Sequence, residues 1–275
     1  MYRRFLLLCL ALLAAVRVAH AEELPPPPSN DAGVPPLLFD ALAKVAQNFD
    51  RWAYTETLQV MDDKGKKKHE AVVRFDPSKS YAEQYQPLSI NGKPPTEKQL
   101  KEYRKRGEKR GEKLMKQEAE GKTPGSEVPR FNINGGSASI DLGRATVVAE
   151  DEHSVTYEVP LKNDNRATIP VDQFQLLGRV NRTTHAFENV SLRLKGAIRM
   201  KLIIKIKSGE ASVDFGPVDA THAPVVKSMT GEATASVLFL KFGGTVDVKR
   251  GDFKRVKPYG ERFGVKIGPL KALDF

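Results

Sequence analysis

The chain has 275 residues, a formal net charge of +10 and one cysteine, Cys9. Because Cys9 lies within an apolar N-terminal run, disulfide bonding and thiol chemistry are excluded for the rest of the chain. No second run of about 20 apolar residues exists, which excludes a further membrane-spanning helix. The excess of lysine and arginine indicates either affinity for anionic surfaces or simply a solvated basic exterior.

The N-terminus has the features of a cleavable secretory signal peptide. The cationic start MYRR precedes FLLLCLALLAAV, an apolar run too short to span a bilayer. Ala19 and Ala21 then flank His20 in a small-x-small cleavage site. We therefore expect residues 1–21 to be removed after Ala21 and the mature chain to reach the periplasm; an uncleaved anchor is the alternative.

A leader and a helix follow the signal peptide. Residues 22–36 are rich in proline and predict a disordered leader. The next stretch, LLFDALAKVAQNFD, places Leu38, Leu42 and Val45 at helical spacing. It predicts an amphipathic helix that opens a single domain over residues 37–275.

The stretch WAYTETLQVMDDKGKKKHEAVVRF predicts a β-hairpin with its turn at DDKGKKK. Trp52, Tyr54 and Leu58 fall on one face of the first strand, and Glu56 has the same parity. A carboxylate on an apolar face needs a partner or a proton. Glu56 therefore marks a polar spot in a ligand cavity, or a bulge or strand end brings its side chain to water.

A second helix is predicted at about 97–119, with Thr96 and Gln99 forming a capping box. It carries nine lysines and arginines against five acids, and two glycines interrupt its narrow apolar stripe. We expect this basic helix to lie on the surface. Its cations could meet an anionic membrane surface or be merely solvated, and we expect no nucleic acid as a partner because no aromatic platform accompanies them.

From Phe131 onward, antiparallel strands are predicted. The stretch AIRMKLIIKIKSG predicts one strand with an apolar face and a cationic face. The apolar face comprises Ile198, Met200, Leu202, Ile204 and Ile206. Turns are expected at SGE (208–210) and at Gly243-Gly244, and the final strand near RFGVKIG.

Signatures of catalytic or metal sites are incomplete or missing. His69-Glu70 begins a zinc-protease pattern, but the position of the second histidine holds Val73. The nucleophile-elbow pattern G-x-S-x-G is missing, and the histidines of the mature chain are isolated from one another. We therefore predict that the protein is not an enzyme and has no catalytic residues, no metal site and no cofactor.

The order of these parts resembles the LolA/LolB-like superfamily of bacterial envelope lipoprotein carriers and lipid-binding proteins. The resemblance is carried by the leader, the amphipathic helix, the hairpin opening RWAYTETLQV, the strand end RFDPS and the late GDFKRV. It implies an α+β fold, in which a large curved antiparallel sheet (an unclosed β-barrel) packs on an N-terminal amphipathic helix around an apolar cavity. The additional basic surface helix departs from the carriers.

The resemblance implies an exported, monomeric protein that binds lipid or lipoprotein acyl chains. The residues expected to line the cavity are Trp52, Tyr54, Glu56, Leu58, Ile198, Met200, Leu202, Ile204 and Ile206. One alternative is an envelope scaffold or sensor that acts through protein–protein contacts. Another is an outer-membrane β-barrel, favoured by the terminal Phe275 and opposed by Pro269, by Lys271 and by the two helices.

Overall fold

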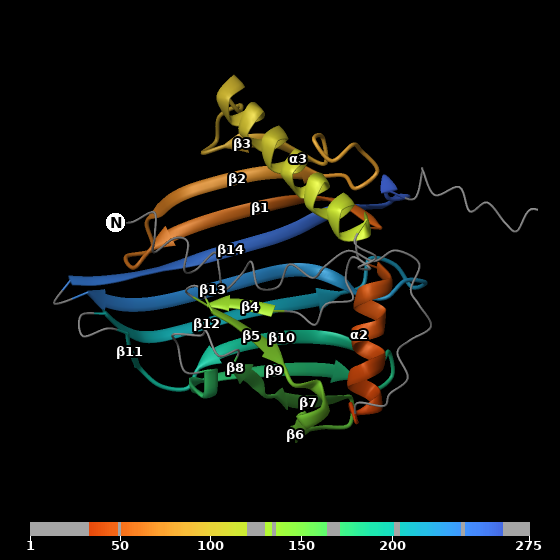
Figure 1. Cartoon of the computed structure of the whole chain (residues 1–275), viewed down its shortest axis with the longest axis vertical. Coiled ribbons are helices and arrows are strands. Elements are labelled where there is room, and N and C mark those ends of the chain that lie inside the picture. Colours follow the sequence, from red (N-terminus) through yellow and green to blue (C-terminus); the bar gives the residue numbers. More distant parts are fainter. Residues whose placement is uncertain are drawn as a thin grey trace, which may run out of the picture.

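The structure is a computed structural model that describes residues 33–48, 51–119, 130–133, 136–163, 171–200, 204–237 and 240–260. Within these ranges the chain forms a large antiparallel sheet, a three-stranded sheet and two α-helices (Figure 1). The prediction of a mainly antiparallel β-structure is confirmed. The predicted signal peptide, the leader up to residue 32 and the strand near RFGVKIG lie outside the described residues.

The large sheet has the strand order β3-β2-β1-β14-β13-β12-β10-β9-β7-β6, and β11 pairs with β12 beside this path. Its first six strands along the chain are β1 (Trp52–Asp62), β2 (Lys67–Phe75), β3 (Tyr85–Ile90), β6 (Thr146–Glu150), β7 (Ser154–Val159) and β9 (Phe174–Asn181). The others are β10 (Ala186–Leu194), β11 (Ile198–Met200), β12 (Ile204–Gly216), β13 (Val225–Val237) and β14 (Leu240–Arg255). The terminal strands β3 and β6 do not pair with each other, so the sheet is open.

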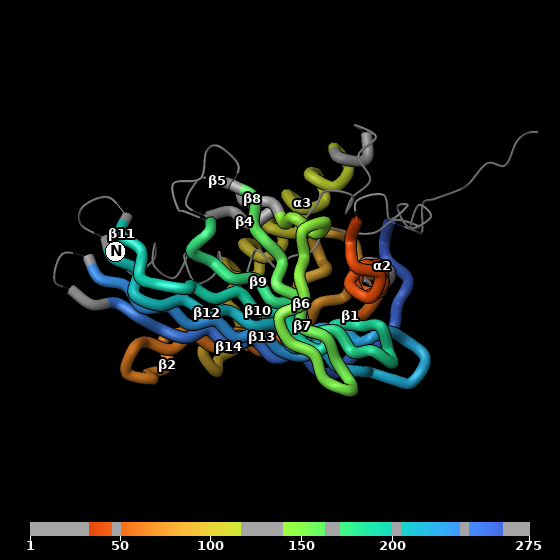
Figure 2. Tube along the Cα trace, turned by 90° about the horizontal axis from the view of Figure 1, so that it is seen from below, coloured from red at the N-terminus to blue at the C-terminus, as the bar shows by residue number. Residues whose placement is uncertain are grey.

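The small sheet has the order β4-β5-β8. Its strands are β4 (Arg130–Ile133), β5 (Gly136–Ile140) and β8 (Leu161–Asn163). The short 3-10 helix η1 (Leu142–Arg144) follows β5, and η2 (Val171–Gln173) follows β8. Figure 2 shows both α-helices on the same side of the central strands β12, β13 and β14. The helices therefore overlie the same side of the large sheet.

The two faces of the large sheet differ because side chains alternate along each strand. On the face turned toward the helices, here called the inner face, the register aligns Leu58 with Val248, Val248 with Met229 and Met229 with Val213. The opposite, outer face is polar; there the Asn189 amide donates hydrogen bonds to Ser212 and Asp214. The alternation thus separates an apolar interior from a hydrogen-bonded exterior.

Helix α2 (Pro36–Asn48) contacts β9 and β10 on the inner face. Its proline start fits the first helical position, where a backbone N–H has no partner within the helix. Leu38 and Ala41 are 1% and 0% exposed and pack with Leu176, Val180 and Phe187. The apolar stripe read from the sequence is therefore the buried face of this helix.

Helix α3 (Glu97–Ala119) begins at the predicted capping box. The Thr96 N–H donates to Gln99 Oε1 at 2.8 Å, and the Gln99 N–H donates to Thr96 Oγ1 at 3.4 Å. Gly107 and Gly111 are buried against Tyr81, where an added Cβ would lie 2.1 Å from the Tyr81 carbonyl oxygen and 2.5 Å from its ring, respectively. The glycines therefore serve a close approach, while most lysines of the helix are exposed as expected.

Two predicted turns are wrong. Strand β12 continues through SGE (208–210), and the single strand predicted over AIRMKLIIKIKSG is instead two strands, because β11 folds back on β12 and pairs Ile198 with Ile206. Gly243 and Gly244 lie inside β14. An added Cβ at Gly244 would lie 2.5 Å from the Met61 carbonyl oxygen, so this glycine permits close strand packing rather than a turn.

Candidate functional site

The predicted cavity residues on β1 lie on the inner face of the sheet. Trp52 is 6% exposed, and Tyr54 and Leu58 are half-buried. Register pairs Tyr54 with Phe75 and Leu58 with Ala71 on β2. These residues therefore belong to the apolar surface between the sheet and the overlying elements.

The second predicted group lies at the other end of the same sheet. Ile198 and Ile206 are 5% and 7% exposed, and Ile206 pairs with Ala235 near the end of β13. Trp52, in contrast, pairs with Arg255 at the far end of β14. The structure does not bring the two groups together. Met200 pairs with Ile204 in the backbone register of β11 and β12. Leu202 lies outside the described residues.

Glu56 has a partner on the neighbouring strand. It pairs in register with Arg250 of β14, whose Nε donates to Glu56 Oε2 at 2.9 Å, with side chains 27% and 21% exposed. Burial disfavours the charged guanidinium, but its electrostatic interactions with Tyr54 and Glu56 and its hydrogen bond to Glu56 outweigh this cost and raise the pKa of Arg250. The bulge of this strand falls between Ala53 and Thr55, so Glu56 itself is a regular, ion-paired strand residue.

Helix α3 brings a tyrosine close to this ion pair. Burial raises the pKa of Tyr103, and the negative charge of Glu56 adds to that rise. Tyr103 also packs on the cluster of Ala71, Val73 and Ile90 from β2 and β3. The basic helix thus covers the part of the inner face that carries Glu56. It packs on the sheet and does not merely lie exposed to solvent.

Aromatic rings from β1, β2, β3 and β14 form a row beside the ion pair. Trp52 and Tyr54 lie with their ring centroids 6.4 and 6.0 Å from that of Phe253. The row continues from Tyr54 to Phe75 at 5.1 Å and from Phe75 to Tyr85 at 4.7 Å. These spacings suit attractive ring–ring contacts.

Each part of this row carries a cation. Arg255 lies 5.3 Å from the Trp52 centroid, Lys227 4.3 Å from that of Phe253 and Arg250 4.4 Å from that of Tyr54. Arg110 of α3 lies over Phe75 and Tyr85 at 5.6 and 5.5 Å. We call these rings and cations the cation–aromatic cluster. Each contact is worth about 0.5–2 kcal/mol, depending on how far water is excluded.

Most of this cluster could not be read from the sequence. The alternation in β1 singled out Trp52, Tyr54 and Glu56, but Lys227, Arg250 and Phe253 come from strands far along the chain. A lysine or arginine near an aromatic residue along the chain is common in an exposed strand, so this spacing does not point to a site. Only the pairing of β1 with β14 and of β14 with β13 makes these residues neighbours.

The Trp52 indole is unusual within the cluster. Its Nε1–H is buried and has no hydrogen-bond partner in the part of the chain that the structure describes. The ring of His222 meets Trp52 edge-on at 5.4 Å, and His222 Nδ1 lies 2.8 Å from Asp219 Oδ1. A buried donor without an acceptor is costly and calls for a specific reason.

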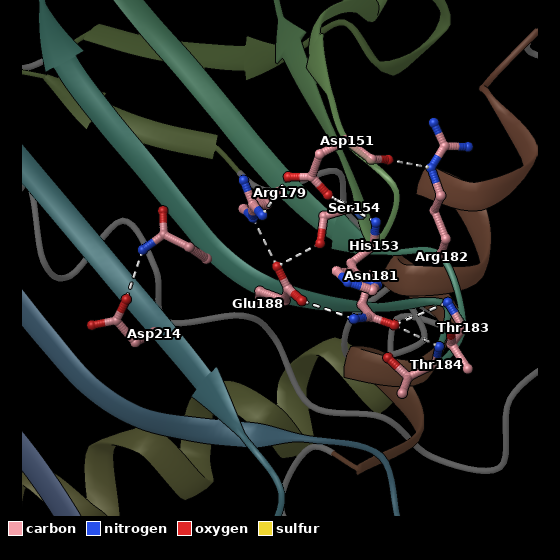
Figure 3. A network of polar contacts seen from close by, with 11 residues as sticks. Asp151, His153, Ser154, Arg179, Asn181, Arg182, Thr183, Thr184, Glu188 and Asp214 are labelled. Atoms are coloured by element: carbon pink, nitrogen blue, oxygen red, sulfur yellow. Dashed lines mark hydrogen bonds and ion pairs between the residues drawn. The ribbon is translucent and has the colours of Figure 1, made fainter.

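A second polar cluster ties together β7, β9 and β10 (Figure 3). Glu188 accepts hydrogen bonds from Ser154 Oγ, Arg179 Nε and Asn181 Nδ2, each at 2.8 Å. Asp151 accepts the backbone N–H groups of His153 and Ser154 as well as Arg179, and these bonds lower its pKa. Because neighbouring donors form hydrogen bonds to each carboxylate, we interpret this network as one that stabilises the turns between these strands.

The described residues show neither a metal-binding cluster nor a membrane-spanning helix. Over the described ranges, no three His, Cys, Asp or Glu residues are grouped so as to hold a metal ion. Neither described α-helix is long and apolar enough to cross a membrane. The cation–aromatic cluster and the adjoining apolar face form the candidate functional site, because charged and aromatic side chains from distant parts of the chain meet there.

Comparisons with known proteins add no relative. Neither a family model, nor a curated protein, nor a solved structure matches this chain.

Proposed function

We propose that this chain is an exported, non-enzymatic protein of the bacterial cell envelope that binds an apolar or amphipathic ligand. The ligand would be a lipid or the acyl chain of a lipoprotein, as in the LolA/LolB-like superfamily. The proposal rests above all on the apolar cluster at the centre of the inner face of the open sheet. Burial of alkyl groups on that face supplies the driving force, about 0.8 kcal/mol for each methylene.

The centre of the inner face supports this proposal. A cluster of residues from β1, β12, β13 and β14 is at most 9% exposed. Its buried members are Val60, Val213, Met229, Ala233, Val246 and Val248. Among the described residues, all its members and the side chains packed on it come from strands of the one sheet, unlike the cluster beneath α2. A bound chain would take the place of part of the packing over this central patch.

The two helices suit the role of covers in this proposal. Helix α2 contacts β9 and β10, whereas α3 contacts β3, so they overlie opposite margins of the sheet (Figure 1). We propose the helix-covered half-barrel of the carriers as the architecture, with a ligand between the helices over the central strands. The exposed lysines of α3 would face anionic headgroups when the protein delivers or collects its ligand at a membrane surface.

One observation favours the alternative of a scaffold or sensor. Strand β6 is exposed along its length, with Val147 and Val148 53% and 48% exposed, at an edge of the large sheet. An exposed edge strand can accept a strand from a partner protein. This role requires no ligand on the inner face, so ligand content separates the two candidates.

The test is the ligand content of the purified protein. The full chain is expressed with its own N-terminus, purified without detergent and extracted with organic solvent for mass spectrometry. We expect a lipid or lipid-like amphiphile in stoichiometric amount. Protein that emerges empty from several lipid-rich preparations would overturn the proposal and favour the scaffold.

A matched pair of variants locates the ligand. Ala233 is 2% exposed on the inner face, while Thr234 is exposed on the outer face. We expect Ala233→Phe to lose co-purified lipid and Thr234→Phe to retain it, with thermal melts confirming that both remain folded. Equal lipid content in two folded variants would place the ligand elsewhere.

A further inference from the structure

We propose, building on the binding function above, that Lys227 and Arg250 in the cation–aromatic cluster bind the carboxylate or phosphate headgroup of an anionic amphiphile whose alkyl chain lies along the central apolar patch. The ligand class is thus narrowed from lipids in general to anionic amphiphiles. The shared chemistry is an oxyanion at the end of an alkyl chain.

The two cations lie over two neighbouring rings. Lys227 precedes Ser228, which pairs with Lys249, the residue before Arg250, so Lys227 and Arg250 occupy adjoining strands. Their rings, Phe253 and Tyr54, are 6.0 Å apart. Cations that lie over two neighbouring rings on adjoining strands can approach one multidentate anion together.

With respect to the described residues, Arg250 retains donors for such an anion. The hydrogen bond from Nε to Glu56 uses one of the five N–H donors of the guanidinium. Arg250 is 21% exposed, so an anion placed there is largely shielded from water and its attraction to the cations is strengthened. Glu56 then orients the guanidinium rather than neutralising the whole group of cations.

The tryptophan supplies a second, independent observation. Trp52 is 6% exposed and its Nε1–H lacks an acceptor among the described residues. Trp52 belongs to the same row of rings through Phe253. An oxyanion bound at this end of the sheet could accept this N–H as well as the cationic donors, which would give the buried donor its partner.

The apolar patch begins next to the cations. Two residues along the register from Glu56 and Arg250 lie Leu58 and Val248, followed by Val60 and Val246. An alkyl chain that leaves the headgroup along β1 and β14 therefore enters the buried cluster directly. The arrangement of charge at one end and aliphatic side chains beyond it is that of an amphiphile.

The experiment uses Trp52, the single tryptophan of the chain, as a fluorescent reporter inside the site. The full chain is freed of co-purified lipid and titrated with lysophosphatidylglycerol and lysophosphatidylcholine of the same chain length, below their micellar concentrations. Glycerol 3-phosphate serves as the headgroup without a chain. We expect the anionic lysolipid to bind about tenfold more tightly than the zwitterionic one, and glycerol 3-phosphate to bind far more weakly.

The variant Lys227→Gln removes one cation from the inner face, and Lys249→Gln removes one exposed cation from the neighbouring strand as its control. We expect Lys227→Gln to weaken lysophosphatidylglycerol about tenfold and to leave lysophosphatidylcholine unchanged, while Lys249→Gln affects neither. Thermal melts of both variants exclude unfolding as the cause.

The outcomes separate the headgroup site from the binding function. Equal affinities for the two lysolipids, with Lys227→Gln without effect, overturn the headgroup site and leave the binding function standing. Tight binding of glycerol 3-phosphate alone overturns the amphiphile and indicates a free phosphate ligand. Binding of neither lysolipid contradicts both proposals.

Discussion

Glu56 illustrates how a charged residue can occupy an apolar strand face. It lies in register with Arg250, 194 residues away in sequence, and their hydrogen bond is 2.9 Å long. Arg250 in turn lies over the Tyr54 ring. Removing either partner leaves a largely buried charge without its counterion, which costs more than the pair itself contributes.

We therefore expect Glu56→Gln to lower the free energy of unfolding by about 1–3 kcal/mol, measured by urea denaturation. The double variant Glu56→Gln/Arg250→Gln recovers part of that loss because no charge is then left unpaired. Glu232→Gln, at an exposed carboxylate, is the control and changes stability little. A double variant that loses the full sum of both single losses contradicts the pairing.

The ionised Asp62 carboxylate stabilises the first hairpin turn, and acid removes this stabilisation. The hydrogen bond from Lys68, together with the backbone N–H groups of Lys66 and Lys64, lowers the pKa of Asp62 from 3.8 to about 2. Because the unfolded chain takes up this proton more readily, the stabilisation is complete above about pH 4 and is lost as the pH falls toward 2. The unfolding free energy therefore decreases across this window.

Asp62→Asn tests this prediction through urea denaturation at pH 7, 4 and 2.5. We expect the variant to be less stable than the natural chain at pH 7, with a smaller further loss between pH 4 and 2.5. Asp63, an exposed neighbour, gives the control Asp63→Asn, whose pH profile follows the natural chain. Superimposable profiles for Asp62→Asn and the natural chain speak against the assigned role.

At the scale of elements, helix α3 is placed by its glycines. An exposed Gly→Ala replacement in a helix commonly stabilises by up to about 1 kcal/mol. At Gly111 a Cβ would lie 2.5 Å from the Tyr81 ring, and at Gly107 it would meet a backbone carbonyl oxygen at 2.1 Å. The steric cost therefore outweighs the gain in helix propensity.

We expect Gly111→Ala to lower the free energy of unfolding by about 1–3 kcal/mol and to speed tryptic cleavage within α3 as the helix loosens from the sheet. The control is Glu112→Ala on the exposed side of the same helix, which should be neutral or slightly stabilising. A more stable Gly111→Ala protein would mean that α3 shifts without penalty.

Strands were easier to predict from the sequence than the turns between them. Alternation correctly marked the inner face of β1, because it depends only on the period of a strand. Turns were wrongly predicted at SGE and at Gly243-Gly244 because of their glycines; these residues lie within long strands. The chemistry of a glycine is the same in a turn and at a close strand contact, so sequence alone does not distinguish them.

At the scale of the whole molecule, we propose that residues 1–21 act as a cleavable signal peptide that directs the protein to the periplasm. We expect the full chain, expressed in a Gram-negative host, to yield periplasmic protein that begins at Glu22, measured by intact mass. Ala21→Arg blocks this cleavage, while His20→Lys, at the unrestricted middle position, permits it. An uncut chain in the membrane fraction would instead indicate an anchor.

The sequence by itself determined the β-rich antiparallel character, the helix at 97–119 and the apolar face of β1, since these follow from periodicity and capping within short stretches. Only the tertiary structure decided that Arg250 pairs with Glu56, that Lys227 and Phe253 join Tyr54, and that Ile198 and Ile206 lie at the opposite end of the sheet. The physical reason is the pairing of β1 with β14. The register between strands so distant along the chain is selected by the burial of both apolar faces together, which no local pattern encodes.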